Sequence, residues 1–172
     1  MNTVYIILGG NIGNRSENLL QARQFIEEEA GKIGSASGIF VTAAWGHTSQ
    51  PDFYNQALCI GTMLPPQQLL NTLLDIEKKM GRIRAGKTYI SRIIDIDILF
   101  YGNKIINEKN LVIPHPLLHL RKFVLEPLVA VAPEFVHPVT GKTIVALLAE
   151  VVDTCQVQVA VGKDEFERLL NS

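Results

Sequence analysis

The chain has 172 residues, 47% of them hydrophobic, and a formal net charge of −1 at pH 7, values that fit one domain with a sizeable core. Its 16 basic residues are spread along the chain, which excludes a duplex nucleic-acid binder, because such a protein needs a concentrated basic surface. No stretch is apolar enough for a membrane span and the first residues lack signal-peptide features, so we expect a cytoplasmic protein with no nucleic-acid or membrane partner.

The domain organisation is simple, because no repeat, low-complexity segment or linker divides the chain. We expect a single domain over residues 1–172, with a core over about 1–136 and a C-terminal extension over about 137–172. The two cysteines, Cys59 and Cys155, lack the spacing of a metal site or a disulfide framework. We expect both to be reduced structural thiols.

The first predicted elements are a strand, a helix and two further strands. Residues 4–8 form an apolar run that ends at a Gly-Gly pair, which is typical of a buried strand followed by a turn. Ser16 is the expected N-cap of the helix. Residues 39–44 and 55–63 predict the two strands. The inward positions of the helix are expected to be Leu19, Leu20, Ala22, Ile26 and Ala30.

A second helix and a fourth strand follow. Pro65 and Pro66 open the helix and Gly81 ends it, and residues 93–101 predict the strand. Gly102-Asn103 predicts a hairpin turn into a short strand near Ile105 and Ile106, and the chain is expected to end in a helix over residues 163–170. The expected inward positions of the second helix are Leu69, Leu73, Ile76 and Met80.

The order strand, helix, strand, strand, helix, strand predicts an α+β sandwich of the ferredoxin-like βαββαβ type. Its sheet should be mostly antiparallel, with both helices on one face.

The segment Ile94-Asp95-Ile96-Asp97-Ile98 is the most informative part of the chain. Alternate side chains of a strand share a face, so the isoleucines and Phe100 should point into one layer and both aspartates to the other. Neighbouring carboxylates repel each other unless a cation intervenes, and hard oxygen ligands at this spacing suit Mg²⁺. A polar, solvent-facing side of an ordinary strand is the alternative, although aspartate is disfavoured in strands.

Several arginines surround this strand in the sequence. Arg82, Arg84 and Arg92 precede the aspartates and Arg121 follows near His115. Paired carboxylates with magnesium and several arginines are the apparatus that phosphoryl transfer requires, whereas each arginine alone could be an ordinary surface residue. Gly141-Lys142-Thr143 resembles the end of a P-loop, but the motif requires a glycine at the position of Val136.

Four motifs in order resemble the 6-hydroxymethyl-7,8-dihydropterin pyrophosphokinase family of folate biosynthesis. The resemblance runs from about Tyr5 to Val136. Its motifs are LGGNIGNR at the start, Gln50 to Asn55, Arg92 to Leu99 and Val112 to Pro116. The resemblance implies transfer of the β,γ-pyrophosphate of ATP to the pterin hydroxymethyl group, with release of AMP and without a covalent enzyme intermediate.

The resemblance also assigns residues to roles. Two Mg²⁺ ions would be held by Asp95 and Asp97, and Arg82 and Arg92 would be the catalytic arginines. The pterin would lie between Phe53 and Phe123, and Asn55 would form hydrogen bonds with the amide edge of the pterin. The further pterin contacts would be Thr42, Ala43, Trp45 and Asp95. The ATP contacts would be Leu70, Glu77, Arg84, Ile98, His115 and Arg121, with Glu77 at the solvent edge of its helix. Packing or surface roles are the alternatives for Phe53, Phe123, Glu77 and His115.

The chain departs from the family pattern in two places. Thr88-Tyr89-Ile90-Ser91 stands where the family usually has arginine, tryptophan, glycine and proline, and Ile90 should stiffen or redirect this segment. Trp45 is bulkier than the usual aliphatic residue, and Ala43-Ala44 replaces a proline-bearing pair. Both changes affect segments expected to cover the substrates.

Three other functions fit parts of the pattern. A non-catalytic ferredoxin-like module would not need the paired aspartates and arginines. An RNA-recognition domain of similar topology would need exposed aromatic residues on a basic surface. A magnesium-dependent transferase with another acceptor would be distinguished by its indifference to pterins. We expect a monomer, with a homodimer as the alternative.

Overall fold

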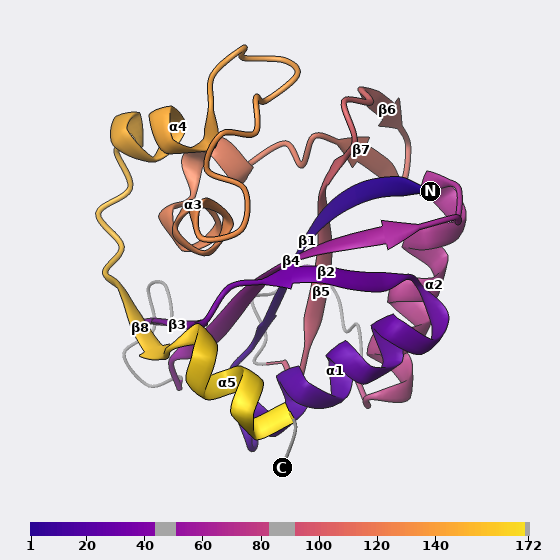
Figure 1. The fold of residues 1–172 in the computed structure, drawn as a ribbon, viewed down its shortest axis with the longest axis vertical. Helices are drawn as coiled ribbons and strands as arrows, with labels where there is room; N and C mark the ends of the chain where they lie inside the picture. The colour runs from indigo at the N-terminus through magenta and orange to yellow at the C-terminus, as the bar shows by residue number, and fades with distance from the viewer. Residues whose placement is uncertain (44–50, 83–91, 171–172) are drawn as a thin grey trace.

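The secondary structure follows the predicted order and contains additional short elements (Figure 1). The computed structural model describes residues 1–43, 51–82 and 92–170. In chain order the elements are β1 (Asn2–Gly10), α1 (Arg15–Glu29), β2 (Lys32–Ala36), β3 (Ile39–Thr42), β4 (Phe53–Thr62), α2 (Pro66–Lys79), β5 (Asp95–Tyr101), β6 (Ile106–Glu108), β7 (Leu111–Ile113), a 3₁₀ turn (Leu118–Leu120), α3 (Lys122–Val129), α4 (Ile144–Glu150), β8 (Val157–Val161) and α5 (Lys163–Leu170).

The main sheet has six strands and its described pairs are antiparallel. Its order is β5-β1-β4-β3-β8, and β2 also pairs with β4. Strand β1 therefore lies between β4 and β5, the strands that carry the pterin-loop motif and the paired aspartates. This arrangement confirms the predicted ferredoxin-like α+β sandwich.

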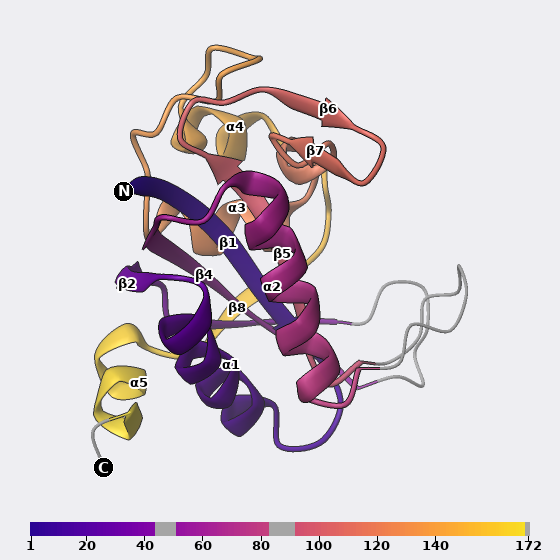
Figure 2. The same cartoon turned by 90° about the vertical axis from the view of Figure 1, so that its right-hand side faces the viewer.

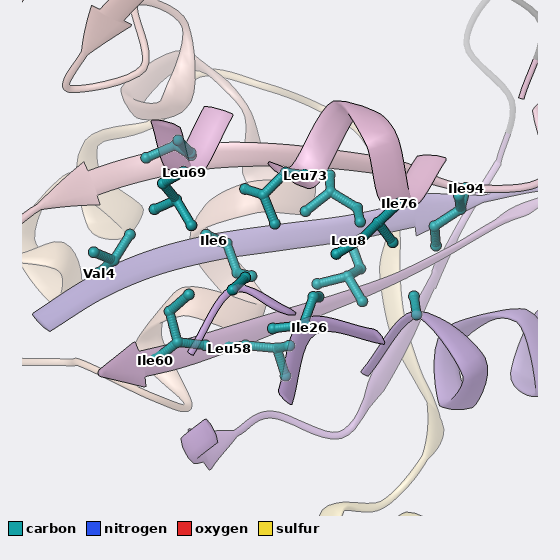
Figure 3. Close-up of a cluster of buried hydrophobic side chains, with 14 of the residues drawn as sticks. Val4, Ile6, Leu8, Ile26, Leu58, Ile60, Leu69, Leu73, Ile76 and Ile94 are labelled. Atoms are coloured by element: carbon teal, nitrogen blue, oxygen red, sulfur yellow. The ribbon is translucent and has the colours of Figure 1, made fainter. Parts of the chain in front are cut away.

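Helices α1 and α2 cover one face of the sheet, as predicted (Figures 1 and 2). Figure 3 shows Leu69, Leu73 and Ile76 of α2 packed over Val4, Ile6 and Leu8 of β1. All the expected inward positions of both helices belong to this core except Leu20, which is partly buried against it. The expected N-cap was wrong by two residues, because Asn14 caps α1 by accepting a hydrogen bond from the Glu17 N–H at 3.3 Å.

The opposite face of the sheet is covered by α3 and α4, which the sequence did not predict. Val124, Leu125 and Leu128 of α3 pack with Ile7 and Leu99 in a second buried cluster. Helix α3 has only eight residues and contains Pro127, a residue that normally argues against a helix interior. The sheet therefore carries the two predicted helices, α1 and α2, on one face and the additional helices α3 and α4 on the other.

The segment Gly141-Lys142-Thr143 is a turn followed by a helix cap. Gly141 has a φ of +70°, and the Thr143 hydroxyl accepts a hydrogen bond from the Ala146 N–H at 3.2 Å at the start of α4. The rejection of a P-loop on sequence grounds agrees with this local structure.

The C-terminal part of the chain completes the sandwich. Strand β8 pairs with β3 at one edge of the main sheet. The predicted helix over residues 163–170 is α5, whose Phe166 is fully buried in the core beneath α1 and α2. Arg23 of α1 forms an ion pair with Glu167 of α5 at 3.1 Å, so this helix is attached to α1 by both apolar and polar contacts.

Strand β5 contains one extra residue relative to β1. Ile98 pairs with Ile6 and Phe100 pairs with Tyr5, which leaves Leu99 without a partner on β1. Such a bulge reverses the alternation of side chains beyond it. The expectation that Phe100 shares a layer with Ile94, Ile96 and Ile98 was therefore wrong, because Phe100 packs in the second cluster.

The turn after β5 also differs from expectation. Gly102 has a φ of +50° and a turn forms there, but the following strand β6 pairs with β7 in a separate two-stranded sheet. The predicted hairpin between β5 and the strand at Ile106 is therefore absent, since Ile106 pairs with Ile113.

Candidate active site

Several of the predicted site residues that the structure describes gather at one end of the sheet, where β1 and β3 end and β4 and β5 begin. Gly9 pairs with Asn55 on one side and with Asp95 on the other, while Thr42 pairs with Phe53. Residues directly opposite each other in an antiparallel ladder share a face. The register therefore places the side chains of Asn55 and Asp95 on one face across a glycine that has no side chain.

That face is the one that α3 covers. Asp97 pairs with Ile7, and Ile7 belongs to the buried cluster beneath α3 and α4. The predicted alternation of Asp95 and Asp97 away from the isoleucines is thus confirmed. Phe123 of α3 also packs against this cluster, so Phe123, Asn55 and the paired aspartates lie on the same side of the sheet.

The two glycines at the end of β1 permit close approach by neighbouring segments. A Cβ atom on Gly9 would lie 3.0 Å from Asn55 Oδ1, and one on Gly10 would lie 2.2 Å from the carbonyl oxygen of Ile93. The backbone that leads into β5 can therefore lie directly against β1 only because residue 10 is glycine.

Asp95 is the centre of an ion-pair network. Arg92 Nη1 lies 2.5 Å from Asp95 Oδ2, and Arg82 pairs with Asp95 Oδ1. Arg82 Nη1 also lies 2.6 Å from Glu77 Oε1. The buried Nε of Arg92 has no hydrogen-bond partner among the described residues, so one donor of this guanidinium is unsatisfied.

Glu77 is buried, contrary to the expectation that it lies at the solvent edge of its helix. Its side chain is 1% exposed, and Oε1 accepts a hydrogen bond from the Ile96 N–H at 2.8 Å. Because β5 is an edge strand of the main sheet, this N–H points away from β1 and requires another acceptor. Glu77 thus links α2, β5 and Arg82.

The charges around Asp97 oppose its ionisation. Burial, followed by the negative charges of Asp95 and Glu77, raises the pKa of Asp97 to about 6, although Arg92 and Arg82 act in the opposite direction. A carboxyl group in such surroundings gains from a nearby cation. Within the described residues, no group of three or more His, Cys, Asp or Glu side chains is arranged to hold a metal. Two carboxylates fit Mg²⁺, which takes its remaining ligands from water and substrate phosphates.

The bulge in β5 holds His115 beside this site. The carbonyl of the extra residue, Leu99, accepts a hydrogen bond from the His115 N–H at 3.0 Å. Burial and the positive charge of Arg121 lower the pKa of His115 to about 4, with Asp95 opposing the shift. Nδ1 of this neutral ring accepts from the Leu117 N–H at 3.2 Å, which leaves Nε2 to carry the proton.

The aromatic and polar residues predicted for the pterin lie next to the arginines. Asn55 Nδ2 donates to Thr42 Oγ1 at 3.1 Å, and both residues are buried. The guanidinium carbon of Arg92 lies 5.5 Å from the centre of the Phe53 ring. A similar contact of 5.7 Å joins Arg121 to Phe123, so each aromatic ring has a guanidinium group within cation–π distance.

The other predicted residues fall into three groups. The side chains of Ile98 and Leu70 are committed to the core beneath α1 and α2, so a contact with a nucleotide would come from the Ile98 backbone or the exposed part of Leu70. Ala43 is exposed at the end of a described stretch. Trp45, Arg84 and the segment 88–91 lie outside the described residues.

Paired carboxylates flanked by arginines, with a polar and aromatic surface one strand away, define a phosphate-transferring enzyme on a ferredoxin-like scaffold. None of the helices in the described ranges has the length and apolar character needed to cross a membrane.

Comparison with known proteins narrows this class. The model of the 7,8-dihydro-6-hydroxymethylpterin-pyrophosphokinase (HPPK) family matches residues 5–133. The 2-amino-4-hydroxy-6-hydroxymethyldihydropteridine pyrophosphokinase of Synechocystis sp. is 41% identical over 156 residues, which cover 90% of this chain and 79% of that protein. The folic acid synthesis protein fol1 of Pneumocystis carinii is 41% identical over 150 residues, covering 87% of this chain and 20% of that protein.

The fold agrees with this assignment. The crystal structure of wild-type HPPK-DHPS from Plasmodium falciparum has a TM-score of 0.73 at 20% identity and covers 87% of this chain and 44% of that chain. The present chain thus spans most of the Synechocystis enzyme but only a fifth of the Pneumocystis protein. It belongs to the HPPK family, and this membership makes it a pyrophosphokinase of folate biosynthesis.

Proposed function

We propose that the chain transfers the β,γ-pyrophosphate of ATP to the hydroxymethyl group of 6-hydroxymethyl-7,8-dihydropterin and releases AMP. The observation that carries the proposal is the row Asn55, Gly9 and Asp95 across the sheet. In this row Asn55, whose amide group can hydrogen-bond to the amide edge of a pterin, lies across Gly9 from Asp95, whose carboxylate can bind a metal–phosphate complex. The oxygen that attacks and the phosphate that receives it would therefore meet above β1.

The proposal includes two Mg²⁺ ions held by Asp95 and Asp97. When bound, the ions neutralise the polyphosphate and stabilise the attacking and leaving oxygens. The raised pKa of Asp97 supports this assignment, because its cause is the crowding of negative charge by Asp95 and Glu77 in a buried position. Asp95 would also contact the pterin side of the site, since it shares a face with Asn55.

The catalytic arginines would be Arg82 and Arg92. Both guanidinium groups pair with Asp95, so they are already directed to the place where the phosphates would bind. Arg92 has a buried Nε donor without a partner among the described residues. A hydrogen bond from this Nε–H to a phosphate oxygen would stabilise negative charge that develops during an in-line displacement.

Recognition of the pterin would fall to Asn55 and to the rings of Phe53 and Phe123. Asn55 Nδ2 donates to Thr42, which orients the amide group and leaves its second N–H for the ligand. A flat heteroaromatic ring gains from burial between aromatic side chains. Thr42, Ala43 and Trp45 would complete the pterin contacts.

The nucleotide would contact residues on the β5 side of the site. His115 is neutral at physiological pH and would donate a hydrogen bond from Nε2 rather than act as a cation. Arg121, next to Phe123, would supply positive charge. Glu77 would act at ATP through Arg82 and the Ile96 backbone. The remaining ATP contacts in the proposal are Leu70, Arg84 and Ile98.

Product analysis tests the reaction directly. The purified protein is mixed with ATP, Mg²⁺ and 6-hydroxymethyl-7,8-dihydropterin, and nucleotides are separated by chromatography. We expect AMP to form in step with the pterin pyrophosphate, and Asp97→Ala to abolish both. Formation of ADP would contradict pyrophosphate transfer. Turnover of the Asp97→Ala variant at the parent rate would contradict the metal site.

The proposal also treats the protein as a cytoplasmic monomer, with a homodimer as the alternative. The free state of Cys59 and Cys155 is consistent with a reducing compartment. Light scattering after size-exclusion chromatography would distinguish the two assembly states.

A further inference from the structure

Asn11 occupies the turn immediately after β1 and contacts both halves of the site. It is 1% exposed, and its side chain uses its acceptor and its donor on two different segments. We propose that Asn11 is a positioning residue that aligns Arg92 on the phosphate side with the segment at Pro51 on the pterin side. This inference rests on the proposed function of Arg92.

The contact with Arg92 is reciprocal. The Arg92 N–H donates to Asn11 Oδ1 at 2.8 Å, and the Asn11 N–H donates to the Arg92 carbonyl at 2.9 Å. Two hydrogen bonds to one residue fix both its position and its orientation. Because Arg92 reaches Asp95 through its side chain, the backbone held by Asn11 determines where the guanidinium lies.

The second contact reaches the start of the pterin-binding strand. Asn11 Nδ2 donates to the Pro51 carbonyl at 3.2 Å, and Arg15 Nη1 donates to the next carbonyl, that of Asp52, at 2.7 Å. Two consecutive carbonyls are therefore held, one by the turn after β1 and the other by the first residue of α1. Phe53, which begins β4, follows this anchored segment directly.

Only an amide side chain provides both contacts at this place. Aspartate would keep the acceptor for Arg92 but lose the donor for Pro51, and alanine would lose both. Gly10 permits the approach, since a Cβ there would overlap the Ile93 carbonyl. The pair Gly10-Asn11 thus brings the two segments together through contacts with the protein itself.

The first test is a double-mutant cycle on turnover. We expect Asn11→Ala to lower kcat by roughly 10- to 100-fold, within the range found when a catalytic group is displaced by about an ångström. If Asn11 acts through Arg92, adding Asn11→Ala to Arg92→Ala should lower kcat by less than about threefold. The same loss in both backgrounds would overturn the inference.

A matched control separates positioning from folding. Asn18 lies in the first turn of α1 and donates from Nδ2 to the Ile12 carbonyl, in the turn after β1, at 2.9 Å in an exposed setting. Asn18→Ala should keep the parent kcat. Equal loss of kcat in the Asn18 and Asn11 variants would mean that any weakening of this turn is sufficient, and would overturn the specific role.

Amide hydrogen exchange, measured without substrates, tests the positioning role of Asn11 separately from the proposed reaction. Amide hydrogen exchange at Arg92 should be at least tenfold faster in Asn11→Ala than in the parent protein, because its acceptor is lost. Asn11→Asp should keep slow exchange at Arg92 and raise the KM for the pterin more than the KM for ATP. Unchanged exchange in Asn11→Ala would refute the inference even if AMP is formed, whereas absence of AMP with altered exchange would refute only the reaction.

Discussion

The close approach of the segment before β5 to β1 can be tested by adding one methyl group. In Gly10→Ala the new Cβ would lie 2.2 Å from the Ile93 carbonyl oxygen and 3.4 Å from that of Arg92. A normal carbon–oxygen contact requires about 1 Å more than the shorter distance, and dense interiors accommodate such overlap by moving backbone. The displaced segment carries Arg92 and leads into Asp95.

The expected consequence is a loss of activity together with a loss of stability. A shift of about 1 Å in catalytic groups costs roughly 100-fold in turnover, whereas overpacking costs about 1–3 kcal/mol in the free energy of unfolding. The assay is the rate of AMP formation at saturating substrates, with urea unfolding measured on the same preparation. The matched control is Gly162→Ala, where nothing lies within 4 Å of the added Cβ. A Gly10→Ala variant with the parent rate and stability would refute this account of the site.

Three further outcomes are expected. Glu77→Gln removes one negative charge near Asp97 while keeping an acceptor for the Ile96 N–H. The pKa of Asp97 should therefore fall below about 6 in the metal-free protein. An unchanged titration of the Asp97 carboxyl group by NMR would contradict this. Phe166→Ala should lower the free energy of unfolding by about 3–5 kcal/mol, because the side chain is fully buried; a loss below about 1 kcal/mol in urea would mean that α5 is not part of the cooperative core. His115 has a pKa of about 4 when folded and about 6.5 when unfolded, so the unfolded chain binds a proton that the folded protein does not. As pH falls from 6.5 to 4, the free energy of unfolding of the parent protein should therefore decrease by up to about 3 kcal/mol relative to His115→Asn. Parallel stability curves for the two proteins would contradict this.

Local patterns were sufficient to predict the elements that carry the site. The alternation in residues 94–98 placed Asp95 and Asp97 together, and the register of β5 on β1 confirms it. The apolar periodicity of α1 and α2 identified their buried faces. These signals are local, because strand and helix periods repeat within a few residues.

The residues that sequence reasoning missed act through contacts between distant segments. Asn11 is one residue of the opening glycine–asparagine motif, and its bond to the Arg92 N–H joins positions 81 residues apart. Glu77 has an ordinary helical spacing, so its burial against the edge of β5 depends on how α2 lies on the sheet. A polar residue that follows a strand-ending Gly-Gly pair was the available signal for Asn11.

The missed elements have weak local signals. Strand β2 has only five residues, and it contains a glycine and a serine, residues that do not favour strands. The bulge at Leu99 leaves no mark in the apolar run of β5, because apolar residues occupy both faces from Ile98 to Tyr101. Where both faces are buried, composition does not reveal which face a residue occupies.

The unpaired Leu99 divides β5 into two segments of opposite phase, and this division has a consequence for sequence change. Upstream of Leu99, even a single-residue deletion would exchange the face of the aspartates with the face of the isoleucines. Downstream, Phe100 and Tyr101 keep their positions relative to β1 through their own pairs with Tyr5 and Val4. The pairing of Phe100 and Tyr101 with β1 therefore does not fix the face of the aspartates, because the unpaired residue between the two segments sets their phases separately.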